Sequence, residues 1–164
     1  MFDWLGDQFE FLVVTRDRDL GDSQPYSDRQ TGRWYPIQGG QVRYVSAMSQ
    51  VPTLIRTVMD ECEPQLLYLN SAVDPMLAIC PLVLRRLRYL RDLPPVVVAP
   101  RGEFSPGALA IKRAKKATYL HAARLLGLYD DVIWHATSPT ESVDIREWWG
   151  EKADVLLAEN MPPR

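Results

Sequence analysis

The stretch Pro95–Gly107 (PVVVAPRGEFSPG) decides the fold class of this chain. Its first part, Pro95–Ala99, is continuously apolar and β-branched, which is typical of a strand buried on both faces of a parallel sheet. Ser105 then caps a long helix, predicted to continue to about residue 126 and to end at Gly127. A strand, a short loop and a helix in direct succession form the repeating unit of α/β proteins.

The same alternation recurs on both sides of this stretch. Further strands are predicted at Phe9–Thr15, Gln41–Ser46, Leu66–Asn70, Val132–Thr137 and Asp154–Ala158. Further helices are predicted at Ser49–Cys62, from Asp74 to about Leu90 with a kink or break at Pro81, and at Ser138–Trp149. We therefore expect an α/β fold: a Rossmann-like parallel sheet with right-handed crossovers and helices on both faces. Ligands of such sheets bind at the carboxyl ends of the strands, here the loops after Thr15, Asn70, Ala99, Thr137 and Ala158.

Composition narrows the class of protein. With 164 residues, 46% of them hydrophobic and 24% charged, the chain is predicted to be one ordinary globular domain. A net charge of −2 argues against nucleic acid as a partner. The sequence has no apolar run long enough for a membrane span and no secretion signal, so the cytoplasm is the expected compartment. Cys62 and Cys80 are interpreted as buried thiols, and two histidines make a metal site unexpected.

The loop after the central strand, PRGEFSPG, is the first candidate site. Arg101 offers a guanidinium suited to phosphate or carboxylate, and the amides at the Ser105 helix start would add to an anion site. The alternative is that Arg101 only pairs with Glu103 or with a neighbouring loop acid, while Ser105 caps its helix. The candidate acceptor or anion-binding residues are therefore Arg101, Gly102, Glu103 and Ser105, together with Asp17 and Asp19 on the long polar loop Asp17–Gly40.

The second motif is HATSPTES, at the end of a predicted strand. Ser138 and Glu141 have the spacing of a capping box, in which each side chain bonds to the backbone N–H of the other. His135 lies within the strand and is interpreted as a satisfied interior histidine, because no nucleophile accompanies it. These three residues are predicted to be structural, and no catalytic residue is assigned.

Basic side chains cluster on two predicted helices. One group is Lys112, Arg113, Lys115 and Lys116, and the other is Arg85, Arg86, Arg88 and Arg91. Such runs are usually solvated helix faces, but together they could contact anionic lipid head groups at the inner face of a membrane. Both interpretations stay open at this point.

Two segments carry a resemblance to a known family. The stretch VVVAPRGEFSPGALAIKRAKKATYLHAARLLGLY followed by WHATSPTESVDIREWW resembles the amino-terminal domain of bacterial family 4 (group 1) retaining glycosyltransferases. FLVVTRDRDLGDSQPY, Trp34 and VRYVS are similar to the earlier strand-and-loop region of that domain. Some relatives have a histidine in the loop after the central strand, where this chain has Arg101 and Gly102.

The resemblance implies one half of a GT-B fold. In that family the amino-terminal domain binds the acceptor, often a lipid-linked sugar or a growing polysaccharide. The carboxyl-terminal domain binds a nucleotide-sugar donor, and transfer retains the anomeric configuration without a metal. The loop from Arg101 to Gly107 would then face the cleft between the domains. The chain itself would hold no cofactor.

Both ends of the chain look cut. The helix tail FDWL, stopped by Gly6, leads directly into a strand, and the last strand leads into Met161-Pro162-Pro163. The family's first strand, its Gly-rich loop and the whole donor domain are missing. We therefore expect an acceptor-side fragment of a hexosyltransferase-like enzyme of cell-surface polysaccharide synthesis, inactive by itself. The alternative is a non-catalytic binding or assembly module that acts with a partner chain. An exposed sheet edge further predicts self-association.

Overall fold

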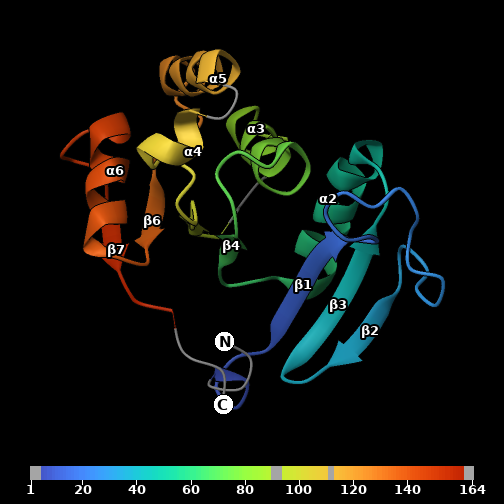
Figure 1. Cartoon of the computed structure of the whole chain (residues 1–164). Coiled ribbons are helices and arrows are strands. Elements are labelled where there is room, and N and C mark those ends of the chain that lie inside the picture. Colours follow the sequence, from blue (N-terminus) through green and yellow to red (C-terminus); the bar gives the residue numbers. More distant parts are fainter. Residues whose placement is uncertain (1–4, 90–93, 111–112, 161–164) are drawn as a thin grey trace. The chain divides into compact units, whose positions relative to one another are not determined.

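A computed structural model describes residues 5–89, 94–110 and 113–160 (Figure 1). These residues group into two compact units. The first takes in the described residues up to Ile55, and the second is Arg56–Asn160. The expectation of a single, incomplete domain without a donor-binding half stays a prediction. Most of the FDWL segment, all of the Met161–Arg164 segment and Arg91 lie outside the described residues.

The first unit contains a three-stranded sheet of order β1-β3-β2. Strand β1 (Phe11–Arg16) runs parallel to β3 (Gly40–Val45), whereas β2 (Trp34–Ile37) is antiparallel to β3. Strand β2 lies inside the segment predicted as a continuous polar loop, so that prediction was wrong there. A two-residue turn joins β2, whose sequence is WYPI, to β3.

Gly40 is required at the start of β3. A Cβ atom at this position would lie 2.0 Å from the carbonyl oxygen of Phe11, the residue paired with it across the sheet. Any side chain here would therefore push β1 and β3 apart.

Helix α2 (Val51–Cys62) carries the chain from the first unit into the second. It was predicted to start at Ser49, but a 3-10 turn, η1 (Met48–Gln50), comes first. The sequence also predicts an apolar stripe along this helix, and three of its members are buried whereas two are partly buried: Leu54, Ile55 and Val58, then Met59 and Cys62. Within the described residues, no helix combines the length and the apolar character needed to cross a membrane.

The second unit is built on a four-stranded sheet of order β4-β5-β6-β7, in which every neighbouring pair is parallel. The strands are β4 (Leu67–Leu69), β5 (Val96–Val98), β6 (Val132–Ala136) and β7 (Val155–Leu157). The chain is thus an α/β protein with a parallel sheet, as the strand–helix alternation predicted. The connections contain η2 (Pro75–Ile79), α3 (Cys80–Arg86), α4 (Pro106–Ala110), α5 (Arg113–Leu125) and α6 (Pro139–Trp149).

The predicted break at Pro81 takes the form of a change in helix type. Asp74 caps the start as predicted, because its carboxylate accepts from the backbone N–H groups of Met76 and Leu77. The segment η2 that follows is a π-helix, and the regular helix α3 begins only at Cys80. Proline has no N–H to donate to the preceding turn, so a wider turn before it satisfies the backbone at lower cost.

Two predicted helix ends are confirmed. Gly127 has a φ of 61°, and the N–H of Leu128 reaches back to the carbonyl of Ala123 (2.8 Å), which closes α5. Gly150 ends α6 with a φ of 92°. The single long helix predicted from Ser105 is described as α4 and α5, and residues 111 and 112 between them lie outside the described residues.

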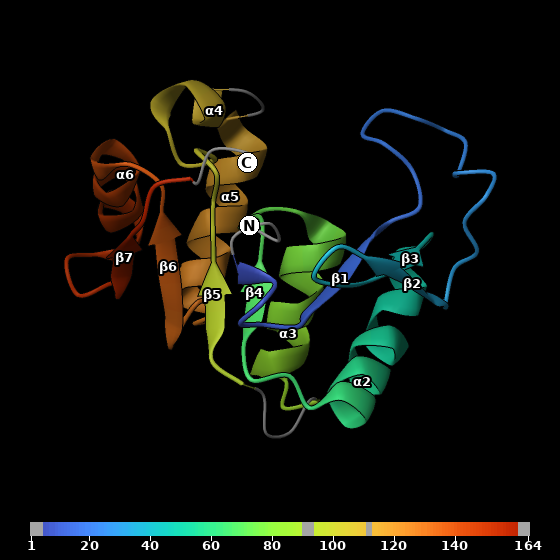
Figure 2. The same cartoon turned by 90° about the horizontal axis from the view of Figure 1, so that it is seen from below.

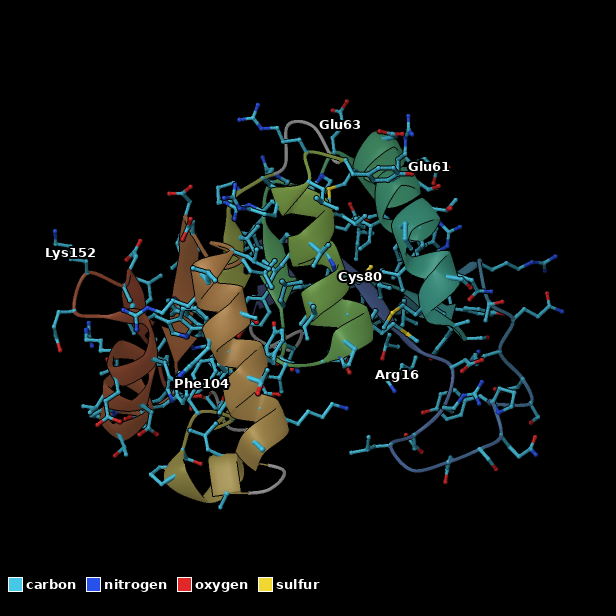
Figure 3. All side chains as sticks on the ribbon, turned by 90° about the horizontal axis from the view of Figure 1, so that it is seen from above. Arg16, Glu61, Glu63, Cys80, Phe104 and Lys152 are labelled. Carbon is cyan, nitrogen blue, oxygen red and sulfur yellow. The ribbon has the colours of Figure 1, made fainter. Side chains whose placement is uncertain are left out.

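Helices α3 and α5 lie on the same face of this sheet. The strand order advances in one direction, and successive right-handed crossovers that step the same way place their helices on one face. Figure 2 shows the strands in front of α3 and α5, and Figure 3, from the opposite side, shows these helices in front. The prediction of helices on both faces of one Rossmann-like sheet stays a prediction.

Side chains along each strand point alternately to the two faces of the sheet, and the two faces differ in character. Val96, Val98 and Trp134 point toward the helices and belong to the hydrophobic core. Tyr68 and His135 lie one position out of phase with them and so point to the other face. This face carries the polar side chains discussed next.

Candidate functional site

The loop after β5 makes a tight turn with an unusual backbone. Arg101 and Gly102 both have positive φ values, 55° and 78°, and the N–H of Glu103 bonds to the carbonyl of Pro100 (3.1 Å). Arginine in this left-handed region costs about 1 kcal/mol or more, so the surrounding contacts must hold it there.

Two carboxylates hold the loop from either side. Glu103 accepts hydrogen bonds from the Ser71 hydroxyl (2.7 Å) and the Ala72 N–H (2.6 Å), in the loop after β4. Glu141 accepts from the N–H of Gly102 (2.7 Å). The loop is thus tied to the ends of the neighbouring strands, and Glu103 bonds to Ser71 and Ala72 rather than to Arg101.

Phe104 anchors the same loop to the core. Its side chain is 2% exposed, and its ring packs edge-on against Trp134 (5.6 Å between ring centroids) and Trp149 (6.2 Å). It joins the core cluster with residues of α5 and α6 (Figure 3). The loop is therefore built as a rigid element, and Arg101 is presented from a fixed backbone.

The Arg101 guanidinium is held by three neutral acceptors. Its Nε donates to Asn70 Oδ1 (2.8 Å), one terminal nitrogen to Asn160 Oδ1 (2.6 Å) and the other to the Tyr68 hydroxyl (3.2 Å). Among the described residues no carboxylate forms an ion pair with Arg101. A guanidinium has five N–H donors, so two remain available on an exposed and oriented cation.

These contacts come from the predicted carboxyl-end loops. The loops after β4, β5, β6 and β7 meet at one edge of the sheet, as expected for parallel strands. We refer to Arg101, Tyr68, Asn70, Asn160 and His135 as the carboxyl-edge cluster. The sequence identified Arg101 but not the asparagines or Tyr68.

Glu141 does more than the predicted capping box requires. Ser138 accepts from the Glu141 N–H (3.2 Å) as predicted, but the Glu141 carboxylate bonds to the N–H and hydroxyl of Thr137 (both 2.7 Å) and to Gly102. The reciprocal bond to Ser138 is replaced by a tie across the sheet. Burial raises the pKa of Glu141, but the hydrogen bonds from Thr137 and Gly102 and the charge of Arg101 outweigh it, so this pKa lies below its ordinary value.

Ser105 acts as a helix cap. Its hydroxyl accepts from the Ala108 N–H (3.3 Å) and its carbonyl from the Leu109 N–H (2.9 Å). Because Glu141 takes the Gly102 N–H as well, the amides of this segment are largely occupied. The contribution of the Ser105 helix start to an anion site stays a prediction.

Asp17 and Asp19 lie in the first unit, and their carboxylates are committed to local contacts. Asp17 is 3% exposed and accepts from Arg18 Nε (2.9 Å) and the Ser46 hydroxyl (2.5 Å). These bonds, that from Arg18 first, hold its pKa below the ordinary value. Asp19 accepts from the Tyr26 hydroxyl (2.7 Å), which raises the pKa of Tyr26 to about 12. Both acids stabilise the long loop between β1 and β2.

The basic run has several different environments. Lys112 lies outside the described residues, and only the backbone of Arg113 is described, within α5. Lys115 is exposed, whereas Lys116 donates to the carbonyl of Ala108 (2.6 Å) at the end of α4.

Two arginines of the second basic group also have partners. Arg85 and Arg86 donate to the carbonyls of Asp130 and Leu126, which follow α5. Lys116, Arg85 and Arg86 therefore each bond to a backbone carbonyl.

No metal centre is described. In the ranges 5–89, 94–110 and 113–160, no three His, Cys, Asp or Glu side chains come together in a way that could hold a metal ion. Cys62 and Cys80 are half-buried, and burial raises the pKa of Cys80.

Comparison with known proteins leaves the family open. No protein-family model matches the chain, and neither a curated protein nor a solved structure matches it.

Proposed function

We propose that this chain is the acceptor-binding domain of a retaining GT-B glycosyltransferase, with Arg101 binding an anionic group of the acceptor. The observation that carries the proposal is the state of the Arg101 guanidinium. It lies at the carboxyl edge of a parallel sheet, where α/β proteins bind ligands, and only neutral side chains hold it. The PRGEFSPG and HATSPTE segments that carry the family resemblance form the loop and its tie to the neighbouring strand.

The chemistry of the cluster favours phosphate over carboxylate acceptors. Asn70 and Asn160 are exposed, and each has an amide N–H₂ group that can donate to a ligand beside Arg101. Several donors around one fixed cation suit a group with many acceptor oxygens, such as the pyrophosphate of a lipid-linked sugar. We therefore propose that the acceptor is a lipid-linked sugar and that the enzyme acts at the cytoplasmic face of a membrane.

Catalysis would need the second half of the enzyme. In this proposal the nucleotide sugar binds to a donor domain outside the chain, and the transferred sugar meets the acceptor above the Arg101 loop. The isolated chain is then expected neither to transfer nor to hydrolyse a nucleotide sugar, and to bind none at micromolar concentration. Micromolar binding by calorimetry would contradict this assignment.

Calorimetric titration with inorganic pyrophosphate tests the anion site. The variant Arg101→Gln should bind at least about tenfold more weakly than the wild type, since hydrogen bonds to charged groups contribute about 1.5–3 kcal/mol. Lys115→Gln removes the same charge from an exposed position on α5 and should leave the affinity within about twofold. Equal losses in both variants would indicate a general charge effect and refute the site.

A second candidate function rests on the outer edge of the sheet. Strand β7 pairs only with β6 among the described residues, and Leu156 and Leu157 are 55% and 54% exposed. An apolar edge of this kind can accept a strand from another chain, as expected for a non-catalytic assembly module. Light scattering tests this alternative: a concentration-dependent dimer that Leu156→Lys disrupts would favour it, and a monomer at high concentration would refute it.

A further inference from the structure

A directed hydrogen-bond chain runs behind Arg101. The Tyr68 hydroxyl lies 3.2 Å from a terminal nitrogen of Arg101 and 2.6 Å from His135 Nδ1. His135 Nε2 lies 2.8 Å from the carbonyl oxygen of Ala158. This row of hydrogen bonds thus links the loop after β5 to β4, to β6 and to the segment after β7.

The chemistry of the end groups fixes the direction of each bond. A carbonyl oxygen only accepts, so His135 Nε2 carries a hydrogen and donates to Ala158. A guanidinium only donates, so the Tyr68 oxygen accepts from Arg101. Burial raises the pKa of Tyr68, which keeps its hydroxyl hydrogen in place, and the remaining acceptor for that hydrogen is His135 Nδ1. In this arrangement His135 Nε2 donates to Ala158 and Nδ1 accepts from Tyr68.

We propose that Tyr68 and His135 are positioning residues that hold Arg101 in its ligand-binding orientation. The inference rests on the proposed function, in which Arg101 binds the anionic group of an acceptor. Arginine loses much side-chain freedom when it is fixed, and a site that fixes it in advance binds its ligand more tightly. Tyr68 holds the guanidinium, and His135 orients the Tyr68 hydroxyl so that its oxygen faces Arg101. His135 thus has a defined role in the site, beyond that of a satisfied interior histidine.

Pyrophosphate affinity of the full chain tests this role. Removing only the hydroxyl, in Tyr68→Phe, should weaken binding about threefold to tenfold, because Arg101 must then be ordered on binding. His135→Leu should do the same, whereas His135→Gln, which offers both a donor and an acceptor, should restore affinity close to the wild type. Tyr119→Phe removes a hydroxyl that bonds to Tyr129 instead and serves as the matched control. Unchanged or tighter binding by Tyr68→Phe would overturn the proposal.

Nitrogen NMR of the histidine rings supplies a readout that does not depend on the ligand. Wild-type His135 should show a hydrogen on Nε2 and an unprotonated, hydrogen-bonded Nδ1, and Tyr68→Phe should shift the Nδ1 resonance and speed exchange of the Arg101 Nε–H. A hydrogen on Nδ1 at neutral pH would overturn the assigned chain. If the wild type binds no pyrophosphate, the proposed function fails. In that case the Nδ1 resonance of His135 still tests the hydrogen bonds themselves. A shift of this resonance in Tyr68→Phe would support them, and an unchanged spectrum would refute them.

Discussion

Replacement of Glu141 tests how the candidate site is held together. Glu141 is buried, with 5% of its surface exposed. Its carboxylate accepts three hydrogen bonds of 2.7 Å, one from the Gly102 N–H and two from the N–H and hydroxyl of Thr137. Glu141→Ala leaves two backbone N–H groups without their acceptor. Each such group costs about 1–3 kcal/mol, so we expect a loss of about 4 kcal/mol. That is a large part of the stability of a domain, about 5–15 kcal/mol.

Glu141→Gln should lose about half as much, because one amide oxygen remains to accept while the N–H₂ group faces a donor. Urea unfolding followed by the fluorescence of the buried Trp134 measures both losses. Glu147→Gln, an exposed position on the same helix, is the matched control and should stay within about 0.5 kcal/mol of the wild type.

The stabilisation of the folded chain by Glu141 is expected to decrease at acidic pH. The pKa of Glu141 in the folded chain lies below its ordinary value, so its contribution is fully present above the unfolded pKa of about 4.3. It is lost as the pH falls through the folded value. The stability difference between the wild type and Glu141→Gln should therefore shrink between pH 6 and pH 3. A loss below about 1 kcal/mol in Glu141→Ala, or a difference from Glu141→Gln that is the same at both pH values, would refute the reasoning.

Three further predictions concern backbone and packing. Arg101→Gly should be more stable than Arg101→Ala by about 1 kcal/mol in urea unfolding, because both remove the guanidinium but only glycine relieves the positive φ of 55°. Equal stabilities would argue against a left-handed backbone there. Gly40→Ala should destabilise the first unit by about 3 kcal/mol, since its Cβ would meet the Phe11 carbonyl, whereas Gly107→Ala, with open space around it, should be nearly neutral. Phe104→Ala should cost about 4 kcal/mol and also weaken pyrophosphate binding; unfolding and calorimetry measure the two effects, and normal affinity would contradict the anchoring role.

Local patterns predicted the fold of the second unit well. The apolar run around Val96–Val98, the cap at Asp74 and the glycine at 127 each report on a few neighbouring residues, and each is found as predicted. Strand β2 (Trp34–Ile37) was missed because it is short and contains Pro36, which weakens an aromatic and apolar run as a strand signal. The strand order itself could not be predicted, because local patterns carry no information about which strands are neighbours in a sheet.

The site was predicted only in part, for a similar reason. Arg101 stood out because it follows the central strand, but its partners Asn70, Tyr68 and Asn160 are 31, 33 and 59 positions away. Glu141 was interpreted as a local cap because its spacing from Ser138 fits one. Its bond to Gly102, 39 positions away, follows from the adjacency of β5 and β6, which periodicity does not reveal.

The central claim is that Arg101 and its neighbours form an anion site at the carboxyl edge of the sheet. An NMR titration of the full chain with inorganic pyrophosphate tests it most directly. The account predicts that the Arg101 Nε–H and the side-chain amides of Asn70 and Asn160 shift together and saturate, and that Arg101→Gln abolishes these shifts. Shifts confined to Lys115 and Lys116 of α5, or none at the carboxyl-edge cluster, would contradict it.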